Sequence, residues 1–111
     1  MRWYAERMNS LLSALAQVGR LKTLVRSGWV RREIPSPESV AEHSFRSAVI
    51  AAVCTDDMGI DQAKLLKMVL LHDIAESDPS VGDITPFDGI SQEEKHKHEH
   101  AAMQKLCKNL P

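Results

Sequence analysis

The chain has 111 residues, of which 43% are hydrophobic and 26% are charged, and its formal net charge is −1. These values predict one soluble domain with a modest core, and no apolar run is long enough to span a bilayer, so we expect no membrane contact. Residues 1–36 are basic, with seven Lys or Arg against two Glu. Such a region can bind nucleic acid or hold one phosphate. Since there is no basic run and no nucleic-acid motif, we expect no extended nucleic-acid binding.

The two cysteines, Cys54 and Cys107, lie far apart and form no CxxC pattern. This spacing predicts reduced thiols in a cytoplasmic protein. The first 19 residues contain no purely apolar segment of the kind that a secretory signal requires, so we expect no leader peptide.

Helices separated by short breaks are predicted along the whole chain. Residues 2–17 place apolar side chains at helical spacing. Residues 20–26 are predicted to form a short second helix. Residues 28–38 are predicted to form a loop, because Pro35 and Pro37 disfavour a helix before themselves.

The third and fourth helices begin at recognisable caps. Ser39 and Glu42 have the spacing of a capping box, in which each side chain satisfies a backbone N–H of the first turn. The third helix is predicted to end near Gly59, a glycine suited to a C-cap. The fourth is predicted over residues 61–76, with Asp61 as its N-cap.

The last helix is predicted from Ser91, which forms a second capping-box pair with Glu94, to about Lys108. Residues 81–90, which precede it, are predicted to form a loop. No segment alternates as a strand does, so the predicted fold class is all-α.

A histidine and an aspartate, His72 and Asp73, end the apolar stretch VLL of the fourth helix. A carboxylate in apolar surroundings needs a partner, which can be a lysine, a helix cap or a cation. A continuous helix would place Glu76 on their face, since it lies four residues after His72. If the third and fourth helices pack together, His43 can face the pair, and two imidazoles with a carboxylate suit Zn, Mn, Co, Fe or Ni.

Structural roles are the alternative for each of these residues. A His-Asp pair recurs by chance, His43 fits a hydrogen-bonded core histidine, and Glu76 fits a solvated helix end. The other histidine-rich segment, HKHEH at residues 96–100, is mostly charged and is predicted to be a solvated helix face.

Five segments of the chain, in order, resemble sequence blocks of one enzyme family: GRLKTLVRSGWV, PESVAEHSFRSAV, LLHDIAE, VGDITP and SQEEKHKHE. The family is that of the HD-domain metal-dependent phosphohydrolases, and the resemblance is to its 5′-deoxynucleotidase branch. It covers the chain from about residue 11 onwards. The resemblance implies an HD-domain helical bundle, with residues 1–111 as a single, partial HD domain.

The resemblance also implies a site built around one divalent metal ion, which could be Mn, Co, Zn, Fe, Ni or Mg. His43, His72 and Asp73 would be its ligands. Glu76 would position or deprotonate the attacking water. Asp83, in GDITP, would be the second active-site acid and would protonate the leaving 5′-oxygen.

The implied substrates are deoxyribonucleoside 5′-monophosphates, which water would split into a deoxynucleoside and phosphate. Trp29 would pack against the sugar and favour deoxyribose. Arg26, or alternatively Arg31 or Arg32, would bind the phosphate.

The chain departs from the family pattern in two ways. The final aspartate ligand of the family has no counterpart, because the only aspartate after Asp83 is Asp88, which falls too early. We therefore expect the chain to be the N-terminal part of the domain, truncated at its C-terminus. Such a chain would lack one metal ligand and could be inactive. The apolar surface left exposed would favour a homodimer. The segment between Glu76 and Asp83 is also longer than the family pattern, which makes the role of Glu76 the firmer of the two.

Two other functions remain open from the sequence. An HD phosphohydrolase could act on another nucleotide phosphate ester, such as a cyclic or polyphosphorylated nucleotide. A non-catalytic helical or dimerising module would keep the fold without the full metal site, and the missing ligand supports this alternative.

Overall fold

The computed structural model describes residues 1–82 and 88–110, and every regular element within these ranges is a helix. The elements follow the chain in the order α1 (Arg2–Val18), η1 (Gly19–Lys22), α2 (Ser27–Arg31), α3 (Val40–Cys54), α4 (Gln62–Leu71), η2 (Ile74–Ser77) and α5 (Gln92–Cys107), where η denotes a 3-10 helix. The predicted all-α fold class is therefore confirmed. None of the described helices is both long and apolar enough to cross a membrane.

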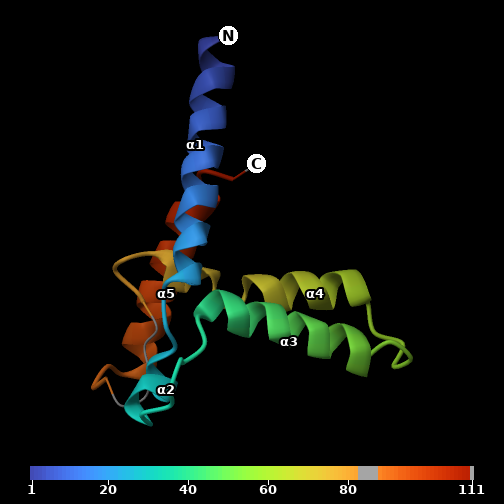
Figure 1. Cartoon of the computed structure of the whole chain (residues 1–111). Coiled ribbons are helices and arrows are strands. Elements are labelled where there is room, and N and C mark those ends of the chain that lie inside the picture. The colour runs from blue at the N-terminus through green and yellow to red at the C-terminus, as the bar shows by residue number, and fades with distance from the viewer. Residues whose placement is uncertain (83–87, 111) are drawn as a thin grey trace.

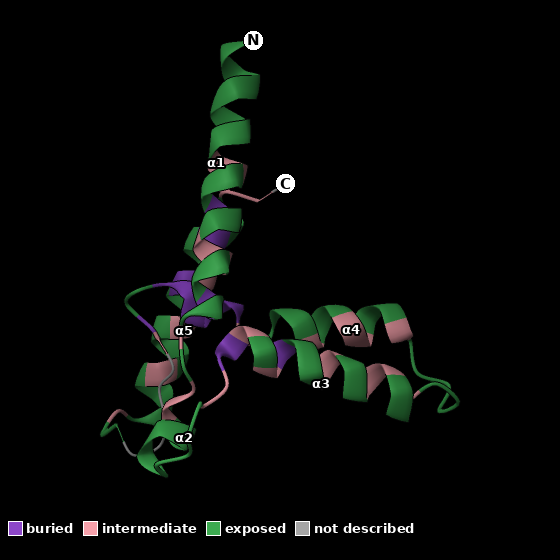
Figure 2. Cartoon of the chain, viewed as in Figure 1, coloured by how far each residue is buried: buried purple, intermediate pink, exposed green. Residues whose placement is uncertain are grey.

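Two helical arms meet at one packed junction (Figure 1). One arm contains α1 and α5, and the other is a hairpin in which α4 runs back along α3. The residues coloured as buried gather mainly at the junction (Figure 2). There Ala14 of α1, Ile74 of η2 and Leu106 of α5 form one cluster. The core therefore lies beside the point where α4 gives way to η2.

The short helix η2 is held from two sides. Ile74 belongs to the cluster with α1 and α5, and the adjacent Ala75 packs with Val81 and Ala102 in a second cluster. Burial of these apolar side chains fixes the backbone of η2. The residue just before it, Asp73, is positioned by the same packing.

The expected caps are present. Ser39 and Glu42 form a capping box at the start of α3, and Ser91 and Glu94 form one at the start of α5. The side chain of Asp61 caps α4 as expected, accepting a hydrogen bond from the backbone of the first turn. These local signals were predictable because each motif satisfies its own backbone N–H groups.

The predicted helix over residues 20–26 is only partly present, because the 3-10 helix η1 ends at Lys22. After η1 the chain becomes extended, and Val25 forms an isolated antiparallel bridge with Ser39. The backbone N–H of Val40 donates to the carbonyl of Leu24 at 2.8 Å. The backbone N–H of Arg26 donates to the carbonyl of Glu38 at 3.0 Å. Contacts with a distant part of the chain thus replace the local helical hydrogen bonds.

The loop expected over residues 28–38 is partly wrong as well, because α2 occupies Ser27–Arg31. Arg26 is its N-cap residue with an extended backbone, and its carbonyl accepts hydrogen bonds from the N–H groups of Trp29 and Val30. Residues 32–38, which contain both prolines, are irregular as predicted.

The third and fourth helices end earlier than predicted. α3 stops at Cys54, and Gly59, with φ +67°, lies in the turn that follows. α4 stops at Leu71, where we expected a helix to residue 76. Asp73 leaves the helical conformation with φ −106° and ψ 10°, and its carbonyl accepts from the N–H of Glu76 to start η2.

Candidate metal centre

His43 lies in the first turn of α3, where the capping box fixes the backbone. The Glu42 N–H donates to Ser39 Oγ at 3.1 Å, and the Ser39 N–H donates to Glu42 Oε2 at 2.7 Å. The backbone N–H of His43 in turn donates to the Ser39 carbonyl at 3.0 Å. The imidazole therefore projects from a helix start whose backbone groups are satisfied.

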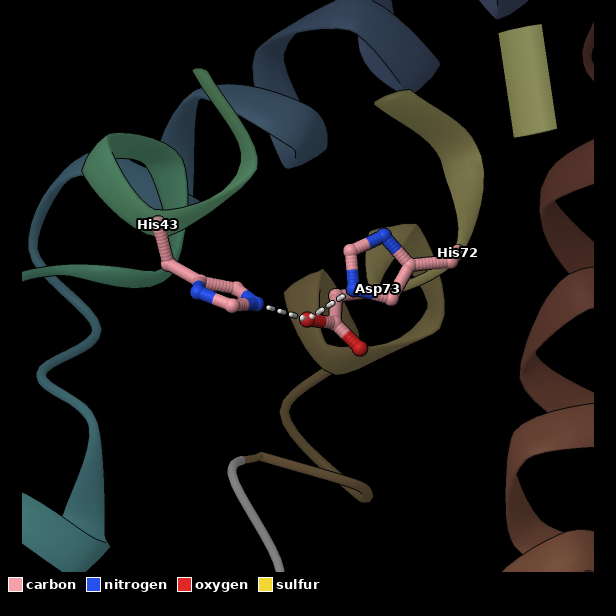
Figure 3. A group of neighbouring side chains, drawn as sticks. All are labelled: His43, His72 and Asp73. Atoms are coloured by element: carbon pink, nitrogen blue, oxygen red, sulfur yellow. Dashed lines mark ion pairs between the residues drawn. The ribbon is translucent and has the colours of Figure 1, made fainter. Parts of the chain in front are cut away.

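His72 and Asp73 come from the break between α4 and η2, and they turn toward His43 (Figure 3). Asp73 Oδ2 lies 2.9 Å from His72 Nε2 and 3.5 Å from His43 Nε2. One ligand atom from each of the three residues lies within 4.8 Å of the other two. The sequence prediction that these three side chains converge is thus met in the geometry.

The break in the helix makes this convergence possible. The side chains of neighbouring residues in a continuous helix point about 100° apart. Here, in contrast, the side chains of His72 and Asp73 contact each other. The Nδ1–H of His72 donates to the Val69 carbonyl. This hydrogen bond leaves Nε2 as the ring nitrogen available to a metal, the usual arrangement for a ligating histidine.

The electrostatics of the group keep the imidazole of His43 neutral. Burial, and then the positive charge of Arg26, lower the pKa of His43 below its ordinary value, although Asp73 and Glu38 oppose this shift. A lowered pKa keeps the imidazole neutral, which is the form that binds metals. Two imidazole nitrogens and a carboxylate are a donor set suited to Zn, Mn, Co, Fe or Ni.

The proposed ligands are partly open to solvent. The side chains of His43 and Asp73 are each 23% exposed, and that of His72 is 42% exposed. A site with three protein ligands and an open side leaves positions for water or substrate, as catalytic sites do. The arrangement therefore fits a reactive centre better than a closed structural one.

The predicted substrate-binding residues lie against the same group. Arg26 Nη1 lies 2.8 Å from His43 Nδ1 and donates to Glu38 Oε1 at 3.1 Å. Trp29 Nε1 donates to the same Glu38 oxygen at 3.3 Å, and 43% of the Trp29 residue is exposed. The structure thus places Arg26 beside His43, and Trp29 shares the acceptor Glu38 with Arg26.

Of the two alternative arginines, Arg31 forms an ion pair with Asp88. That contact ties α2 to the segment before α5. Arg32 is exposed, with no hydrogen bond or ion pair to the three converging side chains among the described residues. Arg26 is therefore the arginine whose described contacts reach the candidate centre.

Glu38 is the residue that the sequence did not single out. Its carboxylate accepts from Arg26 and Trp29 and pairs with Arg46. Burial raises the pKa of Glu38, but the hydrogen bond from Arg26 and the charge of Arg46 outweigh that effect, so the pKa is lowered overall. The only sequence signal was its place in PESVAEHS, directly before the N-cap.

Glu76 does not lie where a continuous helix would put it. Because α4 ends at Leu71, the expected shared face of His72 and Glu76 is absent, and Glu76 is buried in η2 with 8% exposure. It lines a cavity of about 230 Å³ together with Arg20, Leu24 and other residues. The expectation about the helix face was wrong, whereas the role assigned to Glu76 stays a prediction.

Asp83 lies outside the described residues, so its role also stays a prediction. His96, His98 and His100 are exposed on α5, as predicted for a solvated face.

Comparisons with known proteins give one coherent set of relatives. A family model for the HD domain matches residues 18–111. The chain is 44% identical over 102 residues to the 5′-deoxynucleotidase HDDC2 of Xenopus laevis and 45% identical over 102 residues to that of Homo sapiens. It is 41% identical over 101 residues to the 5′-deoxynucleotidase hdd1 of Schizosaccharomyces pombe.

These alignments cover 92%, 92% and 91% of the chain but only 49%, 48% and 50% of the respective relatives. The chain therefore spans about half the length of the curated relatives it matches. A solved structure of a conserved hypothetical protein from Pyrococcus furiosus superposes with a TM-score of 0.74 at 28% identity. That superposition covers 86% of this chain and 58% of the other.

Proposed function

The chain belongs to the HD domain family, and on this premise we propose that it is a metal-dependent hydrolase of deoxyribonucleoside 5′-monophosphates. The convergence of His43, His72 and Asp73 is the observation that carries the proposal. The similarity to relatives named 5′-deoxynucleotidase, over nearly the whole chain, supports the substrate class.

In the proposed mechanism, Nε2 of His43, Nε2 of His72 and the carboxylate of Asp73 hold one divalent ion. Such an ion lowers the pKa of water and offsets the charge of the phosphate. The guanidinium of Arg26 donates hydrogen bonds to the phosphate oxygens, where negative charge redistributes in the transition state. The exposed face of Trp29 packs against the deoxyribose.

The proposed proton transfers use two carboxyl groups. Glu76 holds and deprotonates the water that attacks phosphorus, and Asp83 donates a proton to the 5′-oxygen as the bond from phosphorus to that oxygen breaks. The products are a deoxynucleoside and inorganic phosphate. Of the candidate ions, Zn, Mn, Co, Fe and Ni suit the two imidazoles better than Mg does.

Metal analysis combined with phosphate release tests this proposal. We expect purified protein to bind Mn²⁺, Co²⁺ or Zn²⁺ and to release phosphate from deoxyribonucleoside 5′-monophosphates in preference to ribonucleotides. The variants His72→Ala and Asp73→Ala should each abolish release while helicity by circular dichroism is retained. His98→Ala, on the exposed face of α5, is the matched control and should behave as wild type.

Three results would count against the proposal. Full activity in either metal-ligand variant would remove the site. Bound metal without turnover on any nucleoside monophosphate would indicate a non-catalytic module. Turnover only on cyclic or polyphosphorylated nucleotides would indicate another branch of the family.

We also propose that the protein forms a homodimer and works in the cytoplasm. Phe45, Val49 and Val53 of α3 are exposed at a spacing of four residues, which gives an apolar stripe for a second copy. The two thiols, Cys54 and Cys107, are both free and exposed, which suits a reducing compartment.

A further inference from the structure

One carboxylate connects the substrate side of the centre to its metal side. Glu38 lies in the segment between α2 and α3, and its side chain is only 14% exposed. Its Oε1 accepts from Arg26 Nη1 at 3.1 Å and from Trp29 Nε1 at 3.3 Å. The same oxygen lies 3.6 Å from His43 Nδ1. Glu38 therefore contacts the residues that are predicted to bind the phosphate, the sugar and the metal.

The chemistry of these contacts makes Glu38 a rigid anchor. Charge-assisted hydrogen bonds to a partly buried carboxylate are stronger than neutral ones. Arg46 pairs with the second oxygen, Oε2, so both oxygens of the carboxylate have partners and its orientation is constrained. Arg26 is the N-cap of α2, and Trp29 lies in its first turn. Because both donate to the same oxygen of Glu38, that oxygen fixes the position of one side chain relative to the other.

Glu38 is also the group suited to orient His43. A histidine that binds a metal through one nitrogen normally donates its other N–H to a carboxylate or carbonyl. Arg26 also contacts Nδ1, but arginine carries donors only and cannot accept that hydrogen. Glu38 Oε1 is the carboxylate oxygen near Nδ1.

We propose that Glu38 is a positioning residue of the centre, which sets both the affinity for a divalent metal and the preference for deoxyribose without touching the substrate. It acts by fixing Arg26 and Trp29 relative to His43. The inference rests on the proposed function for its substrate part, and on the geometry of His43 for its metal part.

The test is the variant Glu38→Gln, which keeps the shape of the side chain and removes its charge. We expect Mn²⁺ affinity, measured by titration calorimetry, to fall about 10-fold or more, the size usual for loss of an outer-shell partner. We expect the KM for deoxyribonucleoside 5′-monophosphates to rise about as much. The ratio of kcat/KM for deoxyribonucleotides over ribonucleotides should fall, because the acceptor that holds Trp29 loses its charge.

The matched control is Glu42→Gln. It removes the same charge one residue before His43, at an exposed position, and glutamine keeps the capping box. A merely structural role for Glu38 would lower kcat/KM for both sugar types equally. The proposal is overturned if the sugar preference and the Mn²⁺ affinity of Glu38→Gln match those of Glu42→Gln.

The measurements separate this inference from the proposed function. If wild-type protein binds Mn²⁺ but hydrolyses no nucleotide, the proposed function fails, and the affinities of the two variants still decide the role of Glu38. If wild-type protein hydrolyses deoxyribonucleotides and Glu38→Gln does so equally well with equal Mn²⁺ affinity, only the inference about Glu38 fails. If wild-type protein binds none of Mn²⁺, Co²⁺ and Zn²⁺, both are overturned.

Discussion

Buried acidic side chains have defined partners beside the core as well as at the centre. Asp78 is 5% exposed, and its Oδ1 accepts from the Ser80 N–H at 2.9 Å and from Ser80 Oγ at 2.7 Å. These two hydrogen bonds outweigh the effect of burial and lower the pKa of Asp78 below its ordinary value. The turn that leads away from η2 is thus held by an ionised carboxylate.

The variant Asp78→Asn tests the pH dependence that follows. Because the pKa is lower in the folded state, the charge stabilises the fold above the unfolded pKa of about 3.9, and the stabilisation is lost as pH falls through the folded pKa. We expect wild type to exceed the variant by about 1 kcal/mol in free energy of unfolding at neutral pH. Urea titrations should show this gap closing at pH values below about 3.9.

The exposed Asp56→Asn is the control for that comparison and should show no such gap. A difference between Asp78→Asn and wild type that stays constant down to acid pH would contradict the assigned role, because only an ionised group can lose its contribution on protonation.

At the centre, sequence reasoning found the residues whose types are distinctive and missed the one that is not. His43, His72 and Asp73 could be singled out because imidazole and carboxylate side chains beside apolar runs demand partners, but their assignment as metal ligands came from the family resemblance. Glu38 is one of several glutamates, and nothing local distinguishes it. Its partners come from α2 and α3, so its importance emerges only when those elements meet.

The start of α3 is the element on which His43 depends. Ser39 caps this helix, and its own carbonyl accepts from the His43 N–H. We expect Ser39→Ala to lower the free energy of unfolding by about 1 kcal/mol, the usual cost of losing such a cap. Since the first turn also carries His43, we expect Mn²⁺ affinity to fall as well.

Ser91→Ala provides the matched control, because Ser91 forms the same capping box at the start of α5. Thermal denaturation should show a similar loss of stability for both variants, whereas calorimetry should show weaker Mn²⁺ binding for Ser39→Ala alone. Equal Mn²⁺ affinities in the two variants would show that the α3 cap does not position His43.

Elements were predictable where their causes are local. The caps of α3, α4 and α5 follow from a few adjacent residues. The break after Leu71 does not, because VLLHDIAE has no proline or glycine to stop a helix. Packing of Ile74 and Ala75 in the two core clusters accompanies the break, and a sequence pattern does not reveal which contacts a fold will offer.

The whole molecule is less compact than its length suggests. Its radius of gyration is 16.0 Å, against about 13 Å for a compact chain of this length. The described buried hydrophobic residues are few and lie mainly where α1, η2 and α5 meet, and α4 has none. Stability therefore depends strongly on a small number of side chains.

Leu106→Ala tests that dependence. Leu106 is 3% exposed and packs with Ala14 and Ile74, so its truncation leaves a cavity in the main cluster. We expect a loss of about 2–5 kcal/mol, a large part of the stability of a small domain. Urea denaturation should show the loss, and Leu70→Ala, at a residue 50% exposed, should change stability little. Equal effects of the two substitutions would contradict this view of the core.

The α3–α4 hairpin carries an exposed apolar stripe on α3 that suits assembly of two copies. Phe45, Val49 and Val53 are 69%, 46% and 72% exposed and lie on one side of α3. Water contact with such a stripe is unfavourable, and a second copy can cover it. We expect sedimentation velocity to show a dimer that dissociates on dilution and a monomer for the double variant Phe45→Ser/Val49→Ser.

Met58→Ser is the control for the double variant, because Met58 is 66% exposed but lies in the turn after α3. It removes a comparable apolar side chain without touching the stripe, so it should leave the dimer intact. A monomeric wild type at every concentration, or equal weakening by Met58→Ser, would show that the stripe does not join two copies. Mn²⁺ affinity should be unchanged in both variants, since neither alters His43, His72 or Asp73.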